Sequence, residues 1–424
     1  MSRNTAKEEQ YLTRVADSIV RQRLRSAPAV LLEGARACGK TTTARLFAAS
    51  EVLLERRLAA VSLASIASLP VLDGAVPRLV DEWQVVPDIW DIVRRECDKR
   101  GLPGQFILTG SADPPTDIKQ HSGVGRVARV QMRPLSLFES GLSTGAVSLR
   151  ALFEGVECSA PTPSAEFGDV VDAICRGGWP LCHNLNPDDA QDFVSDYLTE
   201  LTQTEVPAVD GSKRDPYRLG RLFNSLSRNI STEATIRTLS ADTGGSRPLD
   251  PRTADSYLSA LRRLFIVEDM PAWSPKLRSR SRLRRAPKRQ LADPSLAVAA
   301  LGADRKRLLA NPETLGFLFE SLCVRDLRVY CGAQRAELNH YRDNTGLEVD
   351  TIIWKRNGEW IAAEIKLGGR SAVDAAAASL IKLRDRIDTT AVGELRRLLV
   401  ITATGFAYER TDGVSVTPIT SLGP

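Results

Sequence analysis

Eight residues near the amino end have the types and spacing needed to hold phosphate groups. The stretch from Gly34 to Thr41 reads GARACGKT and matches the pattern G-x-x-x-x-G-K-[ST] at every required position. In such a loop, backbone N–H groups and the start of the next helix face the phosphates. Lys40 would reach the β- and γ-phosphates, and the Thr41 hydroxyl would hold Mg²⁺. The residues expected to bind the nucleotide here are Gly34, Ala35, Arg36, Ala37, Cys38, Gly39, Lys40, Thr41 and Thr42.

Two adjacent acids follow a second apolar stretch, in the sequence RLVDEW. An acid at the carboxyl end of a strand beside a P-loop is where Mg²⁺ needs a carboxylate, and Asp81 fits this position. Glu82, the next residue, would polarise the attacking water as a general base. The alternative is an ordinary strand end with two solvated acids. The P-loop upstream favours the catalytic interpretation.

A third apolar stretch, QFILTGS, ends in small hydroxylated residues. A polar side chain at this point could sense the γ-phosphate from between the two motifs. Thr109 and Ser111 are both candidates, and Ser111 is preferred. Farther along, Arg126 could stabilise transition-state charge as an arginine finger, or it could be a surface arginine.

Four charged residues near the carboxyl end have the pattern E…D…E-x-K, which is similar to the catalytic pattern of PD-(D/E)xK nucleases. Glu364 and Lys366 are two apart on an expected strand, so both face the same side. Asp350 and Glu364 could hold one or two Mg²⁺ ions, with Glu320 completing the cluster from a helix. Lys366 would hold or activate the attacking water. A purely structural role for these charges is the alternative.

A densely basic tract lies between residues 276 and 289, with eight cations in fourteen residues and no acid. Such a tract binds phosphate backbones without reading their sequence, because it releases counterions. It contains no aromatic residue, so base stacking is not expected there. A solvated loop, or a loop that pairs with acids of another domain, is the alternative. The cations are Lys276, Arg278, Arg280, Arg282, Arg284, Arg285, Lys288 and Arg289.

The elements around these residues are predicted from periodicity and breakers. Residues 147–162 mix Ser, Pro and Thr and are interpreted as a linker, and two amphipathic helices follow before residue 210. Three helical stretches, 216–226, 232–242 and 250–264, precede an expected strand at 265–270 and the basic tract. This order of helices, strand and basic loop is that of a winged helix.

Bulk composition agrees with a multidomain globular protein. The chain has 424 residues, of which 43% are hydrophobic and 26% charged, so two or three domains are expected. No apolar run suits a membrane span, and the amino end lacks an apolar signal core. Seven cysteines without a C-x-x-C pair suggest reduced thiols, so we expect a cytoplasmic protein.

Taken together, GARACGKT, RLVDEWQ, ILTGSA and GRVARVQMRPLSLFE resemble prokaryotic AAA-type ATPases whose carboxyl half is a domain of unknown function. The resemblance implies ATP as the nucleotide, slow hydrolysis, and an α/β P-loop fold with an additional strand and a helical lid. It yields four expected regions. They are a P-loop AAA-type ATPase domain at 1–146, a linker and helical lid at 147–210, a winged helix at 211–305, and a restriction-endonuclease-like α/β domain at 306–424.

These features predict an ATPase that couples its nucleotide state to nucleic-acid binding, with DNA weakly favoured over RNA, and to metal-dependent phosphodiester cleavage. Two other functions remain open. One is a non-catalytic nucleic-acid-binding switch with a structural E…D…E-x-K cluster. The other is a protein-interaction switch whose basic tract meets an acidic partner. The oligomeric state also stays open, since an arginine finger acting in trans needs a neighbouring copy.

Overall fold

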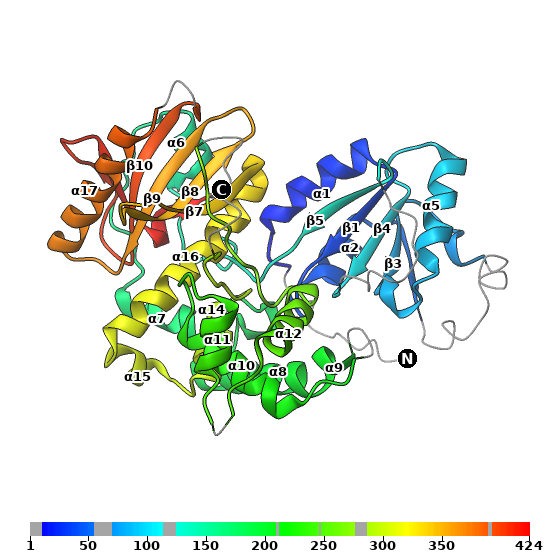
Figure 1. Cartoon of the computed structure of the whole chain (residues 1–424). Helices are drawn as coiled ribbons and strands as arrows, with labels where there is room; N and C mark the ends of the chain where they lie inside the picture. The colour runs from blue at the N-terminus through cyan, green and yellow to red at the C-terminus, as the bar shows by residue number, and fades with distance from the viewer. Residues whose placement is uncertain are drawn as a thin grey trace.

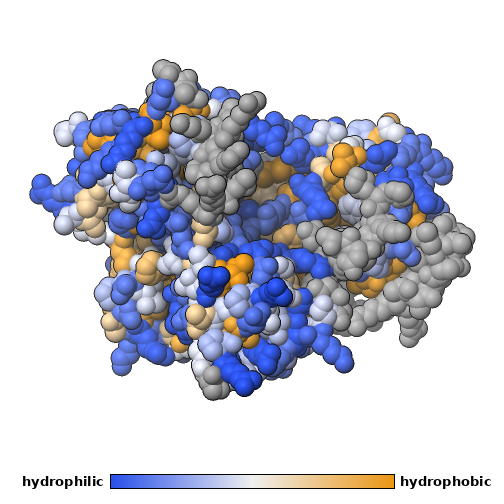
Figure 2. Space-filling model, viewed as in Figure 1, coloured by the Kyte–Doolittle hydropathy of each residue, from blue (hydrophilic) through white to orange (hydrophobic). Residues whose placement is uncertain are grey.

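The computed structural model describes residues 11–54, 70–112, 124–208, 212–245, 247–275, 286–388 and 392–424. Two sheets lie on opposite sides of the molecule, with helices packed below and between them (Figure 1). Hydrophilic residues cover most of the face seen in this view, with small hydrophobic spots scattered among them (Figure 2). Among the described helices, none combines the length and apolarity needed to cross a lipid bilayer.

The first sheet is parallel and has the spatial order β2-β3-β4-β1-β5 in the described residues. Its central strands β1 and β4 are short and mostly apolar, as expected for strands that are covered on both faces. The strand β4 lies between β1 and β3, which agrees with the expected additional strand. The strands are β1 (Ala29–Glu33), β2 (Ser50–Leu53), β3 (Arg78–Asp81), β4 (Phe106–Gly110) and β5 (Val127–Gln131).

Three helices flank this sheet, and each has a clear start or stop. The helix α2 (Lys40–Phe47) begins directly after Gly39, whose φ of 99° places it in the left-handed region. The helix α5 (Ile89–Arg100) ends at a left-handed Gly101. The helix α1 (Val15–Ser26) packs on the sheet and also contacts the long helix α16 (Pro312–Gln334) of the carboxyl-terminal half.

The middle of the chain is helical, and side-chain caps begin most of its longer helices. Asp215, Thr235 and Asp250 each accept a hydrogen bond from a backbone N–H of the first turn. A π-helical turn spans Leu201–Glu205. The helices are α7 (Phe167–Arg176), α8 (Pro187–Glu200), α9 (Val206–Ala208), α10 (Pro216–Arg228), α11 (Ile236–Asp242), α12 (Pro251–Arg263), α14 (Pro294–Ala300) and α15 (Arg305–Leu309).

Two predictions for this region need correction. The stretch 265–270, expected as a strand, makes only isolated antiparallel bridges, Val267 to Leu291 and Met270 to Lys288. Residues 147–162, expected as a linker, contain β6 (Val147–Ser148) and α6 (Leu149–Phe153). The helix α6 forms because Leu149, Leu152 and Phe153 are all buried. It is too short to give a recognisable helical periodicity in the sequence.

The second sheet has the order β11-β12-β10-β9-β8-β7 and mixes parallel and antiparallel pairs. The long helix α16 (Pro312–Gln334) precedes it, and α17 (Arg370–Arg386) connects β9 to the parallel strand β10. The strands are β7 (Ala336–Arg342), β8 (Glu348–Lys355), β9 (Trp360–Lys366), β10 (Leu395–Thr402), β11 (Tyr408–Glu409) and β12 (Val414–Pro418). A last strand, β13 (Leu422–Gly423), pairs with β6.

The hydrophobic core shows which parts of the chain fold together. One large cluster of buried residues runs through the middle helices, α16 and one face of the second sheet. The other face of that sheet and the two faces of the first sheet have separate clusters. The middle helices and the second sheet therefore share a continuous apolar core, whereas the first sheet carries its own.

Candidate nucleotide site and carboxyl-terminal carboxylate cluster

The predicted P-loop connects β1 to α2 at the carboxyl edge of the first sheet. Lys40 is the first residue of α2, and its ammonium donates to the backbone oxygens of Gly34 and Ala35 at 3.0 and 2.9 Å. A Cβ added at Gly34 would lie 2.1 Å from the Met132 carbonyl oxygen, so this position requires glycine. The loop is thus packed against the middle of the GRVARVQMRPLSLFE motif, at Met132.

Thr41, Asp81 and Thr109 form one hydrogen-bonded group beside the P-loop. The hydroxyls of Thr41 and Thr109 donate to the same carboxylate oxygen, Asp81 Oδ1, at 2.8 and 2.6 Å. Parallel strands bring this about, because β1, β4 and β3 all end at the same edge of the sheet. The structure brings together the two residues that were predicted to bind Mg²⁺, and their hydroxyl and carboxylate oxygens are the donors that Mg²⁺ prefers.

The predicted general base lies next to this group. Glu82 has a left-handed φ of 52°, an uncommon conformation for a non-glycine residue that is often found at functional sites. Its backbone N–H donates to Thr109 at 2.8 Å, and its carboxylate accepts from Ser111 at 3.0 Å. Gln84 also donates to both Glu82 and Ser111. Sequence reasoning missed Gln84, although its place two residues after Glu82 was a usable signal.

The remaining P-loop residues connect the loop to its neighbours. Arg36 forms an ion pair with Glu205, and the Tyr197 hydroxyl donates to the Arg36 carbonyl at 3.3 Å. Both partners come from the helical middle, and together with Ser111 they line a cavity of about 230 Å³. Ala35 and Cys38 are buried, Ala37 has a φ of 61°, and Thr42 is exposed at the surface of α2.

Arg126 lies at the opposite edge of the first sheet from the P-loop. It directly precedes β5, and its carbonyl accepts from the N–H of Ala29, the first residue of β1. Its guanidinium pairs with Asp98 at 2.6 Å. A role as an arginine finger on its own P-loop is therefore contradicted, because parallel strands separate their amino and carboxyl ends by the strand length. A role in trans stays a prediction.

In the carboxyl-terminal half, adjacent strands bring together three of the predicted catalytic residues. Asp350 lies on β8, and Glu364 and Lys366 lie on the neighbouring β9. The Lys366 ammonium is 2.9 Å from Asp350 Oδ2 and 2.7 Å from Glu364 Oε2. The Ile365 N–H also donates to Asp350 at 3.0 Å. Strand periodicity was sufficient to predict this arrangement.

Glu320 on α16 joins the same group through Lys288, which was predicted to belong to the nucleic-acid-binding basic tract. The Lys288 ammonium lies 2.9 Å from Glu320 Oε1 and 3.1 Å from Asp350 Oδ1. Burial and the Asp350 charge raise the pKa of Glu320 to about 8. Although burial raises the pKa of Asp350, Lys288 and Lys366 outweigh it and hold that pKa below its ordinary range. Asp350 is therefore the ionised centre of the cluster.

The carboxylates fit Mg²⁺ by chemistry, but their present geometry favours ammonium groups. Carboxylate oxygens are suitable ligands for this ion, and a cavity of about 630 Å³ exposes the cluster to solvent. In the described part of the chain, however, no group of three or more His, Cys, Asp or Glu side chains is arranged to hold a metal ion. Instead, the ammonium groups of Lys288 and Lys366 contact these carboxylates.

The basic tract needs a partial correction. Lys276, Arg278, Arg280, Arg282, Arg284 and Arg285 lie outside the described residues. Lys288 and Arg289 are described, and they are only 2% and 3% exposed. Arg289 pairs with Asp269 at 2.8 Å, and Lys288 pairs with Glu320 and Asp350. These two cations are not on a surface open to a polynucleotide, because buried charges must be paired within the protein.

The end of the GRVARVQMRPLSLFE motif connects the two halves of the molecule. Arg14 donates to the carbonyls of Cys38 and Arg133 at 2.9 and 2.6 Å and pairs with Glu139. The Leu137 N–H donates to Asp326 of α16 at 2.9 Å. The motif therefore contacts the P-loop at its middle and the carboxyl-terminal half near its end.

A second connection runs through Glu268, which precedes the basic tract. Its carboxylate pairs with Arg133 of the motif at 2.9 Å and with Arg328 of α16 at 3.0 Å. Although burial raises the pKa of Glu268, the two guanidinium groups outweigh burial and lower it to about 2. Sequence reasoning missed Glu268, because nothing local distinguishes it from a solvated acid.

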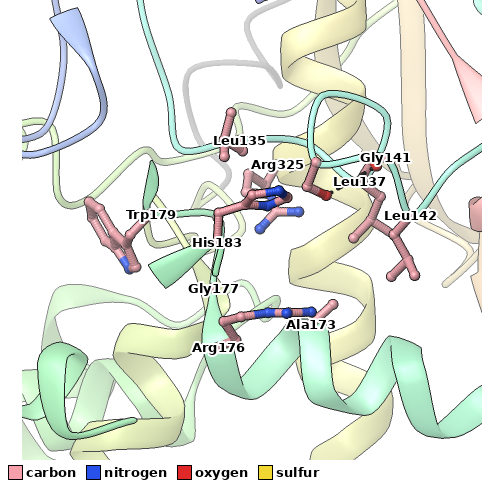
Figure 3. A pocket seen from close by; sticks show the side chains of 12 residues that line it. Leu135, Leu137, Gly141, Leu142, Ala173, Arg176, Gly177, Trp179, His183 and Arg325 are labelled. Atoms are coloured by element: carbon pink, nitrogen blue, oxygen red, sulfur yellow. Dashed lines mark hydrogen bonds between the residues drawn. The ribbon is translucent and has the colours of Figure 1, made fainter. Parts of the chain in front are cut away.

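A cavity of about 240 Å³ lies where the motif, α7 and α16 meet (Figure 3). Leu137 and Leu142 provide apolar wall, and His183 and Arg176 present basic groups to it. Burial and the Arg176 charge lower the pKa of His183. A Cβ added at Gly178, which also lines the cavity, would lie 2.2 Å from the Leu135 carbonyl, so the motif and the helical middle are in close contact.

Comparisons with known families cover three successive parts of the chain. Residues 26–140 match a model described as an AAA domain. Residues 168–307 and 315–422 match two models described as domains of unknown function, DUF8612 and DUF4143. Residues 26–140, which hold the P-loop and its acidic partners, are therefore similar to AAA-type P-loop ATPase domains. ATP binding and hydrolysis are the activities that this match supports.

Several known proteins are similar to this chain over much of its length. Two uncharacterized proteins, from Mycobacterium bovis and Mycobacterium tuberculosis, are each 26% identical over 377 residues, covering 83% of this chain and 73% of the relative. A solved Walker-type ATPase of Pyrococcus abyssi is 14% identical, with a TM-score of 0.41, over 69% of this chain and 97% of that chain.

Proposed function

We propose that this protein is a Mg²⁺-dependent ATPase that couples its nucleotide state to nucleic-acid binding and to phosphodiester cleavage in its carboxyl-terminal half. The observation that carries the ATPase part is the shared hydrogen bonding of Asp81 by Thr41 and Thr109 beside the P-loop. When bound, Mg²⁺ would neutralise developing phosphate charge. Thr41 and Asp81 would hold it, and Lys40 would exchange its backbone partners for phosphate oxygens.

Hydrolysis is assigned to Glu82 and the groups that orient it. Ser111 and Gln84 donate to its carboxylate and hold it at the edge of the sheet. An oriented carboxylate can accept the proton of an attacking water. Ser111 would report the presence of the γ-phosphate to Glu82 through the same hydrogen bond.

The coupling proposal is supported by contacts that lead from the P-loop to the other regions. Arg36 contacts the helical middle through Glu205 and Tyr197, which suits a lid at 147–210. Arg133, Glu268 and Arg328 connect the ATPase domain, the proposed winged helix at 211–305 and α16 in one ion-pair group. A change in the P-loop could bias these contacts, which is the physical requirement for coupling between sites.

The nuclease-like assignment of residues 306–424 is supported by element order and by the cluster. The order α16, β7, β8, β9, α17, β10 places Asp350 and Glu364 on adjacent strands beneath α16, which carries Glu320. Lys366 is positioned to hold the attacking water at Asp350. We propose that the six cations between residues 276 and 285 contact the polynucleotide backbone. We also propose a cytoplasmic location, which the seven free, buried cysteines support.

The proposal is tested by metal-dependent cleavage of plasmid and single-stranded DNA and RNA, with and without ATP. Wild type is compared with Asp350→Ala, Lys366→Ala and Glu82→Gln, and with Lys355→Met as a matched control on the same sheet. Cleavage that both cluster variants lose, and that depends on ATP through Glu82, supports the function. ATP hydrolysis with retained DNA but no cleavage in Mg²⁺ or Mn²⁺ would reject the nuclease part.

A second candidate function is a non-catalytic ATP-dependent binding switch. The specific observation in its favour is that both lysines already satisfy the carboxylates of the cluster. In that case DNA or RNA affinity would fall with salt and change with nucleotide, and no substrate would be cut. A protein-interaction switch would instead give complexes from cells that survive nuclease treatment.

A further inference from the structure

Lys288 is a buried lysine at the mouth of the carboxyl-terminal cluster, contributed by a different part of the chain. Its ammonium lies 2.9 Å from Glu320 Oε1, 3.1 Å from Asp350 Oδ1 and 3.4 Å from Glu348 Oε1. Lys288 is 2% exposed, yet it lines the same 630 Å³ cavity as the acids. A single cation thus sits among three carboxylates from α16 and β8.

The backbone holds this lysine firmly in place. Lys288 exchanges two backbone hydrogen bonds with Met270, at 2.9 and 3.0 Å. The next residue, Arg289, does the same with the stretch from Ser231 to Thr232, at 2.8 Å each. The Arg289 guanidinium is anchored to Asp269 at 2.8 Å. Only the side chain of Lys288 can therefore leave the carboxylates without loss of backbone pairing.

Charge balance explains why an ammonium group is stable in this place. On its other oxygen Asp350 contacts Lys366, so one carboxylate is held between two cations. Although burial lowers the pKa of Lys288, Glu320 and Asp350 outweigh burial and raise it above its ordinary value. The ammonium keeps its charge because it donates hydrogen bonds to Glu320 and Asp350 and lies close to Glu348.

A divalent ion would need the same oxygens that Lys288 uses. Mg²⁺ and Mn²⁺ bind carboxylate oxygens at roughly 2.0–2.2 Å, much closer than an ammonium nitrogen. An ion between Glu320 and Asp350 would therefore overlap the position of the Lys288 nitrogen. The two cations must exclude each other at this point.

We infer that Lys288 is a built-in cation that occupies the metal position between Glu320 and Asp350, so that a divalent ion enters only when the lysine side chain is displaced. This inference rests on the proposed function of the cluster and adds that Lys288 controls the entry of the metal ion. The residue that regulates the site belongs to the proposed winged helix, which would link the two regions.

The inference is tested by calorimetric titration of the full chain with Mn²⁺ alone. Lys288→Met removes the charge and keeps the length of the side chain. It is expected to bind Mn²⁺ about tenfold more tightly than wild type, in the range by which groups around a metal site alter affinity. Lys355→Met, on the same strand as Asp350, should bind as wild type does. Affinity that is unchanged or weaker in Lys288→Met overturns the inference.

A second measurement uses the wild-type protein, so it does not depend on how the variant folds. The reactivity of the Lys288 amine toward an acylating reagent is followed by peptide mass spectrometry, with and without millimolar Mn²⁺. Displacement predicts a rise of several-fold at Lys288 and no rise at Lys355. No rise at Lys288 overturns the inference.

Failure of this inference and failure of the proposed function are distinguishable. Tighter Mn²⁺ binding by Lys288→Met without any cleavage supports metal exclusion by Lys288 and contradicts nuclease activity. Cleavage by wild type with no gain in Mn²⁺ affinity in Lys288→Met contradicts metal exclusion and supports nuclease activity.

Discussion

The Thr41 hydroxyl donates a hydrogen bond of 2.8 Å to Asp81 Oδ1, which joins the P-loop to a residue forty positions away. The same oxygen also accepts from Thr109 at 2.6 Å. These two hydrogen bonds orient one carboxylate oxygen of Asp81 toward the position where the Thr41 hydroxyl would hold Mg²⁺. The Mg²⁺-dependent part of ATP affinity should therefore depend on this pair.

Thr41→Ala and Asp81→Asn should each reduce the affinity for ATP in Mg²⁺ by about tenfold or more, and should have less effect in EDTA. The double variant should lose less than the sum of the two, because both residues act on one ion. A titration with a fluorescent ATP analogue, with and without EDTA, measures this. Arg45→Gln, on the exposed side of α2, is the control, and an unchanged response to Mg²⁺ in both variants would contradict the assignment.

Glu82→Gln should bind ATP but hydrolyse it about 10²- to 10⁴-fold more slowly, because an amide cannot accept the proton of the attacking water. Phosphate release under single-turnover conditions measures the chemical step, and ATP affinity is measured in parallel. Glu51→Gln, which removes a surface carboxylate of the same domain, should retain the wild-type rate. Hydrolysis at full rate in Glu82→Gln would show that the base is another group.

Glu268 should contribute a stability that depends on pH. Its pKa is about 2 in the folded protein, below the ordinary value of 4.5. A carboxyl with a lowered folded pKa binds protons more readily when unfolded, so its stabilisation is complete above about pH 4.5 and is lost as the pH falls toward 2. The full contribution is about 3 kcal/mol.

Thermal melting of Glu268→Gln and wild type between pH 6 and pH 3 measures this contribution. The variant should melt at a lower temperature near neutral pH, and the difference should shrink as the pH falls through about 4. Glu154→Gln, an exposed acid in a surface ion pair, should follow wild type throughout. A constant difference at all pH values would argue against an ionised Glu268.

Arg325→Met should destabilise the protein by about 3–5 kcal/mol, because it leaves two buried carboxylates without their cation. The guanidinium pairs with Asp293 at 2.8 Å and Asp326 at 2.7 Å, and all three side chains are at most 1% exposed. Urea unfolding followed by tryptophan fluorescence measures the change. Arg305→Met, which breaks a surface pair with Asp172, should cost about 1 kcal/mol or less. A similarly small loss of stability in Arg325→Met would contradict the stabilising role of its buried ion pairs with Asp293 and Asp326.

Much of both candidate sites could be predicted from local patterns. The P-loop is a contiguous stretch whose glycines, lysine and threonine have roles set by backbone geometry. Glu364 and Lys366 face one side because strand side chains alternate. The acid pair after RLV could be placed beside the P-loop because parallel strands end at a common edge.

Other features depended on contacts between distant parts of the chain. Lys288 and Arg289 belong to a basic stretch in sequence. In the structure both are buried and paired with acids that lie up to 62 positions away in the chain. Arg126 was a candidate arginine finger from the sequence, but strand direction places it at the far edge of the sheet from the P-loop. The stretch after residue 146 looks like a linker until β13, near the end of the chain, pairs with it.

The sequence by itself determined the phosphate loop, the acids expected to serve it and the strand-borne E-x-K pair, because each depends on a few neighbouring residues. Only the tertiary structure decided which charges are solvated and which are paired. The cost of burying a charge depends on partners that come from elsewhere in the chain, and local sequence carries no record of them. For this reason the lysine that lies in the carboxylate cluster could not be told from its neighbours in a basic tract.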